Sequence, residues 1–98
     1  MAIEITTRHM KVSAEVKDHA QSRGDQIADE FSNVENVHVI IDGRSHRKMA
    51  EIVVQGKNHL RIEASGLADE IIPAIDMAVD KAVGQLRKAS KKIQEHRE

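Results

Sequence analysis

The chain has 98 residues, 40% of them hydrophobic, which suits one domain with one modest core. Its formal net charge is −1, and Phe31 is its only aromatic residue, so the core must be aliphatic and base stacking on aromatic side chains is disfavoured. The absence of cysteine, of a long apolar run and of a secretory signal argues against disulfides, thiolate metal sites and a membrane role, and suits a cytoplasmic protein.

The first half of the chain predicts a strand, a helix and a second strand. Residues 1–7 alternate between apolar and polar side chains, as a half-buried strand does. Ser13 suits the N-cap of the following helix, in which Gly24 should cost about 1 kcal/mol relative to alanine. Residues 36–42 alternate again and predict the second strand. The expected apolar face of the helix carries Val16, Ala20, Ile27 and Phe31.

The second half predicts two more strands and a long helix. Residues 49–55 and 58–64 read as the third and fourth strands, and residues 65–68 read as a loop. The helix is expected to start at Asp69, and Pro73 is tolerated because it then lies in or near the first turn.

This order predicts an α+β fold, β-α-β-β-β-α, formed by the single domain 1–98. The first two strands are joined through a helix and should run parallel, whereas the later strands should form antiparallel hairpins. The result is a four-stranded mixed sheet with two helices packed on one face. Two neighbouring helices then frame a groove on the side away from the sheet.

The C-terminal helix has two distinct faces. One is apolar and carries Ile75, Val79, Ala82, Leu86 and Ile93 at helical spacing. The other is cationic, and a row of cations over several turns can follow a line of phosphates. A plainer interpretation is that acids at the helix start and bases at its end complement the helix dipole. The cationic residues are Lys81, Arg87, Lys88, Lys91 and Lys92.

Further basic residues lie elsewhere in the chain. Lys17 and Arg23 belong to the first helix, and Arg8 precedes it. The loop at residues 44–48 is another basic cluster, although a hydrophilic turn is the plainer interpretation. A helix-surface ion pair is the alternative role for Arg23, which is surrounded by acids. The nucleic-acid hypothesis requires that the cations of the last helix remain unpaired within the monomer.

The histidines do not form a recognisable metal or catalytic motif. They are scattered over several elements, without the spacing that marks a metal site, and no nucleophile motif or glycine-rich phosphate loop is present. We therefore expect no enzyme activity, metal ion or cofactor. The histidines are His9, His19, His38, His46, His59 and His96.

The chain resembles a known family over nearly its whole length. The resemblance rests on a strand ending in ITTRHMKVS, on the element order, and on the segment IEASGLADEIIPAIDMAVDKAVGQLRKASKK. These features are similar to the short ribosome hibernation promoting factors, of the ribosome-associated inhibitor or light-repressed-protein type. The sequence departs from the usual family pattern, which has Tyr, a base, Lys and a larger apolar residue at Ile72, Gly84, Gln26 and Gly24.

The resemblance implies a bacterial, non-enzymatic protein that binds the small ribosomal subunit between its head and body. It would occlude the messenger and transfer RNA sites and inhibit translation during dormancy and stress. The implied partner is small-subunit ribosomal RNA, with no membrane or small-molecule substrate, and the free protein should be a monomer without the C-terminal dimerisation domain of the long forms. The implied RNA-binding residues are Arg23, Lys81, Lys88, Lys91 and Lys92, with Arg87, Lys17 and Arg8 as further candidates.

Three alternatives stay open from the sequence. A generic double-stranded RNA-binding module would use the same helix to recognise A-form shape. A small metal-binding or enzymatic protein would use the histidines. A self-associating domain would use an open sheet face with Ile40 and Val53 outward.

Overall fold

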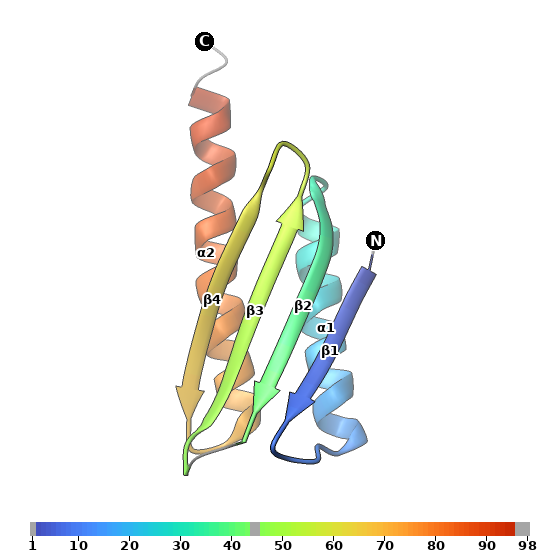
Figure 1. Ribbon diagram of the computed structural model, residues 1–98. Coiled ribbons are helices and arrows are strands. Elements are labelled where there is room, and N and C mark those ends of the chain that lie inside the picture. The colour runs from blue at the N-terminus through green and yellow to red at the C-terminus, as the bar shows by residue number, and fades with distance from the viewer. Residues whose placement is uncertain (1, 44–45, 96–98) are drawn as a thin grey trace.

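The four strands and two helices occur in the predicted order (Figure 1). A computed structural model describes residues 2–43 and 46–95, and describes side chains at residues 3–43 and 46–89. The elements are β1 (Ala2–Arg8), α1 (Ala14–Glu30), β2 (Val34–Asp42), β3 (Lys48–Gly56), β4 (Arg61–Ala68) and α2 (Ile71–Glu95).

The sheet has the order β1-β2-β3-β4 and is mixed, as predicted. β1 and β2 pair in parallel because α1 connects them, whereas β2–β3 and β3–β4 are antiparallel neighbours. Both helices cover the same face of the sheet (Figure 1). The predicted α+β fold is therefore confirmed.

The core lies between this sheet face and the helices and is aliphatic except for Phe31. Alternate residues of β2 point into it, as the period of two requires. The apolar stripe of α2 is buried as far as Leu86, while the side chain of Ile93 lies outside the described residues. On the opposite face of the sheet, Ile40 is only 8% exposed, so the expected outward apolar pair with Val53 does not form an open apolar patch.

Both helices start close to the predicted residues. The Ser13 hydroxyl accepts a hydrogen bond from the Val16 amide and caps α1, as predicted. α2 begins at Ile71, two residues later than predicted, and Pro73 lies in its first turn where no intrahelical donor is needed. No helix in the described ranges combines the length and apolar content that a membrane crossing requires.

The predicted bounds of β4 are wrong at both ends. Asn58 and His59 have φ values of 61° and 63°, so they form the turn after β3 and do not start the strand. At the other end, residues 65–68 pair with β3 up to the Lys48–Ala68 register and do not form a loop. The glycine at position 66 suggested a loop, but it serves a packing role within the strand.

Gly66 allows α2 to approach β4 closely. A Cβ atom at this position would collide with the carbonyl oxygen of Ala74 and would lie 2.7 Å from the Cβ of Met77 and 2.9 Å from the amide nitrogen of Ala78. Two of these are backbone atoms of a helix and cannot move aside individually. The strand–helix contact therefore depends on glycine, as expected where two backbones approach each other.

We predict opposite effects for two glycine-to-alanine substitutions. Gly66→Ala should destabilise the protein by about 1–3 kcal/mol because it forces β4 away from α2. Gly84→Ala should stabilise it by up to about 1 kcal/mol, because a Cβ there meets nothing within 4 Å and alanine is the better helix former. Urea unfolding followed by circular dichroism measures both. Equal effects of the two substitutions would contradict the close-approach role of Gly66.

Candidate nucleic-acid interface

The two helices run parallel, and three polar contacts join them in register. His19 Nε2 lies 2.7 Å from Asp76 Oδ1, and Arg23 donates to Asp80 at 2.7 Å. Further along, Arg87 donates to Glu30 at 3.1 Å. Each contact joins residues 57 positions apart, so equal steps along α1 and α2 keep the helices in phase. The polar residues on their facing edges therefore meet as specific pairs.

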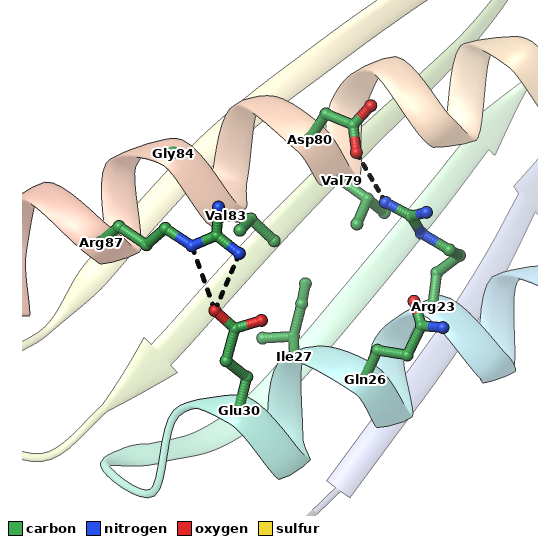
Figure 2. Close-up of a pocket in the computed structure, with 9 residues that line it drawn as sticks. All are labelled: Arg23, Gln26, Ile27, Glu30, Val79, Asp80, Val83, Gly84 and Arg87. Atoms are coloured by element: carbon green, nitrogen blue, oxygen red, sulfur yellow. Dashed lines mark hydrogen bonds and ion pairs between the residues drawn. The ribbon is translucent and has the colours of Figure 1, made fainter.

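A groove of about 380 Å³ lies between the last two of these contacts (Figure 2). Ile27, Val79 and Val83 line it with apolar atoms, and the Arg23–Asp80 and Arg87–Glu30 pairs stand at its two ends. Gly84 also lines the groove, and a Cβ atom at this position would meet no other atom within 4 Å. The predicted groove away from the sheet is confirmed, and the residues at its ends form ion pairs.

Arg23 braces the two helices. Its side chain is only 25% exposed, and besides Asp80 it has Asp76 at 3.8 Å from its Nε atom. That nitrogen is enclosed and has no hydrogen-bond partner among the described residues. The ion pair foreseen for Arg23 exists, but its partners lie on α2 and not among the neighbouring acids of α1.

Arg87 is also paired, but at the surface. Its Nε and one Nη atom both lie 3.1 Å from the same carboxylate oxygen of Glu30. The side chain of Arg87 is 67% exposed and that of Glu30 is 45% exposed. An ion pair this open to water and salt contributes at most about 1 kcal/mol. The expectation that Arg87 is unpaired is therefore wrong for the free protein.

Lys81 faces the edge of the sheet. Its ammonium group donates to the carbonyl oxygen of Ser65 at 3.0 Å, and Gln85, one turn later, donates to that of Glu63 at 3.3 Å. These bonds occupy carbonyl groups on the free edge of β4, which would otherwise be open to pairing with another strand. The expectation of a free Lys81 is wrong, although its side chain is exposed and retains two further N–H donors.

The far end of α2 carries the cation that is most available. Lys88 is exposed and has no partner among the described residues. It follows Leu86, the last side chain of α2 known to be buried, and this end of the helix extends past the β3–β4 hairpin (Figure 1). Lys91 and Lys92 continue the helix backbone here, but their side chains lie outside the described residues.

The remaining basic candidates lie near the opposite end of the molecule. Lys17 lies near the start of α1 and Arg8 ends β1, and both of these element ends are at the lower end of the molecule in Figure 1. Both are exposed and have no side-chain partner in the described ranges. In the 44–48 cluster, Arg44 lies outside the described residues, and Arg47 is 3.8 Å from Asp69. The structure therefore does not bring these residues together with Lys88.

Three of the histidines pair with neighbouring polar groups. Besides His19 with Asp76, His9 lies 3.2 Å from Asp42, and His38 lies 2.8 Å from the Thr6 hydroxyl. The described residues contain no group of three or more side chains that could hold a metal ion.

Comparison with known proteins identifies the family. A family model described as sigma 54 modulation protein / S30EA ribosomal protein matches residues 3–94. The chain belongs to this family. The resemblance to ribosome hibernation factors that was seen in the sequence is confirmed. The protein is ribosome-associated, as its family is.

Solved structures share the fold of this family member. A ribosomal subunit interface protein from Coxiella burnetii aligns with a TM-score of 0.84 at 20% identity, over 93% of this chain and 99% of that one. The N-terminal domain of Protein Y from Thermus thermophilus aligns with a TM-score of 0.77 at 19% identity, over 90% and 98%. No curated protein matches the sequence.

The sequence analysis missed the acids that hold the arginines. Asp76, Asp80 and Glu30 were not singled out in the sequence, yet each contacts a basic side chain of the other helix. A sequence signal does exist, because the contact residues of each helix follow the same steps of four and seven. Reading that signal requires knowing that the helices are parallel and adjacent.

We predict that the two ion pairs differ in their contribution to stability. Asp80→Asn should destabilise the protein by about 1 kcal/mol, because Arg23 is three-quarters buried and would lose its shortest partner, although the Asp80 carboxylate itself is 73% exposed. Glu30→Gln should change stability by less than about 0.5 kcal/mol, because an exposed pair is weak and a carboxylate at a helix C-terminus is itself unfavourable. Urea midpoints measure both, and similar losses would contradict the distinction.

Proposed function

We propose that this protein binds the small ribosomal subunit through its ribosomal RNA and blocks the messenger and transfer RNA sites. Membership of a ribosome-associated family supports the partner, and one solved relative is named a ribosomal subunit interface protein. The proposed contact surface, here called the α2 cationic surface, consists of Lys81, Arg87, Lys88, Lys91 and Lys92.

The single observation that carries this proposal is the position of Lys88. It is exposed and unpaired among the described residues, and it follows Leu86, the last side chain of α2 known to be buried. A cation on a helix that has no hydrogen-bond or ion-pair partner can meet a phosphate without first breaking an internal contact. Bases neutralising RNA phosphates release counterions, which gives such a surface most of its affinity.

Inhibition by occlusion requires no chemical step. The sheet and both helices share one aliphatic core, so the domain behaves as a rigid body that fills a site when its cations are bound. Arg23 contributes indirectly, because it keeps α1 and α2 in register. Lys17 and Arg8 are on α1 and β1, so they are not part of the α2 cationic surface and stay separate candidates for RNA contacts.

We predict that reversing the charge of Lys88 and Lys92 together lowers affinity for small subunits by more than about 100-fold. Each substitution removes a phosphate contact and adds repulsion. Co-sedimentation with purified bacterial small subunits measures binding, and circular dichroism confirms the fold. The control reverses Lys11 and Lys48, which have the same charge and lie at the opposite end of the sheet. If the Lys88/Lys92 variant co-sediments with small subunits as well as the wild type does, the proposal is wrong.

We further predict a steep dependence on salt. About five phosphate contacts should give a slope on the order of −4 for log affinity against log salt concentration. The same titration with a plain RNA duplex separates this function from a general double-stranded RNA-binding module. Binding of the duplex as tightly as the subunit would support the module instead.

A further inference from the structure

Glu30 occupies the edge of Arg87 that phosphate would use. The Nε and one Nη donor of Arg87, which form a forked edge suited to an oxyanion, both point to the Glu30 carboxylate (Figure 2). A phosphate reaching this edge must therefore displace the carboxylate. In the free protein, Glu30 takes the place of the proposed RNA ligand.

The Arg87–Glu30 ion pair is easy to break, because Arg87 is more open to solvent than Arg23 at the other end of the groove. The side chains of Arg87 and Glu30 are 67% and 45% exposed. The Arg23 side chain is only 25% exposed and lies near two acids, although the carboxylates of Asp80 and Asp76 are themselves 73% and 37% exposed. An exposed pair costs little to break. The guanidinium of Arg87 is thus free to exchange partners, and that of Arg23 is held in place.

The stability of α1 does not explain why a glutamate stands at position 30. It is the last residue of α1, and no basic residue lies in that turn to offset the negative end of the helix dipole. A carboxylate at this position costs about 0.3–1 kcal/mol. Its one described side-chain contact is with Arg87. A residue that positions another must itself be held in place, and nothing described holds Glu30 except the arginine.

The carboxylate also affects bound RNA. A phosphate bound to this edge of Arg87 would lie near the Glu30 carboxylate, which contacts the same edge in the free protein. Two like charges well within the screening distance of roughly 8–10 Å repel each other at moderate salt. The Glu30 carboxylate would therefore lower RNA affinity in two ways. It would repel the bound phosphate, and it holds Arg87 in an ion pair in the free protein.

We infer that Glu30 is an internal competitor for RNA, which lowers the affinity of the α2 cationic surface by holding Arg87 in the free protein. This inference rests on the proposed function and names the residue that sets its strength. It makes ribosome binding weaker and more reversible than the basic residues alone would give. If Glu30 instead positioned Arg87 for RNA, its removal would have the opposite effect.

The test compares Glu30→Gln with Asp29→Asn in binding to purified bacterial small subunits. Both variants remove one negative charge from the last turn of α1, but Asp29 is exposed and has no partner among the described residues. Glu30→Gln should bind about two- to five-fold more tightly than Asp29→Asn, the factor that corresponds to losing one exposed ion pair. Its salt slope should also be steeper, by up to about one, because Arg87 then counts as a full phosphate contact.

A double-mutant cycle with Arg87→Gln supplies the second readout. In that background Glu30→Gln should change affinity no more than Asp29→Asn does, because the residue it competes for is gone. Urea unfolding of every variant shows whether the fold is intact. A gain that persists without Arg87 would show a general charge effect and overturn the inference.

Two further outcomes distinguish failure of the competitor role from failure of the proposed function. If Glu30→Gln binds more weakly than the wild type, or only as tightly as Asp29→Asn, the competitor role is wrong. The proposed function still stands in that case if the wild type binds small subunits and the Lys88/Lys92 variant does not. Absence of wild-type binding to small subunits overturns the proposed function and this inference together.

Discussion

The burial of one apolar stripe of α2 against the sheet determines how every other residue of that helix is presented. The stripe includes the small residues Ala74, Ala78 and Ala82, and none is more than 2% exposed. Small side chains on the helix and Gly66 on β4 allow the two backbones to approach closely. Once this face is fixed, one flank of α2 faces α1 and the other faces the free edge of β4.

Each flank then meets its own partners. Towards α1, the parallel register pairs acids and bases of the two helices, and towards β4, Lys81 and Gln85 bond to strand carbonyls. Basic residues that look equivalent along the sequence therefore differ in the structure. Arg23 is a partly buried side chain that joins the two helices, Arg87 is a surface arginine paired with Glu30, and Lys88 is open to solvent.

This division suits a protein that acts by filling a site. Rigidity comes from the shared core and from the contacts between the helices, while affinity would come from the end of α2 that projects past the hairpin (Figure 1). The two requirements use different ends of the same helix, so either can change without the other. Under the proposed function, an acid such as Glu30, which contacts Arg87, would adjust affinity without altering the fold.

The sequence by itself determined the element order, the mixed sheet, the helix faces and the family, because these follow from local periodicity and from motifs along the chain. It did not determine the bounds of β4, since Gly66 looks like a loop residue until α2 is seen to cross it. It also did not reveal which cations are free. Charge availability depends on partners 57 positions away, and only the tertiary structure brings Glu30 to Arg87 and Asp80 to Arg23.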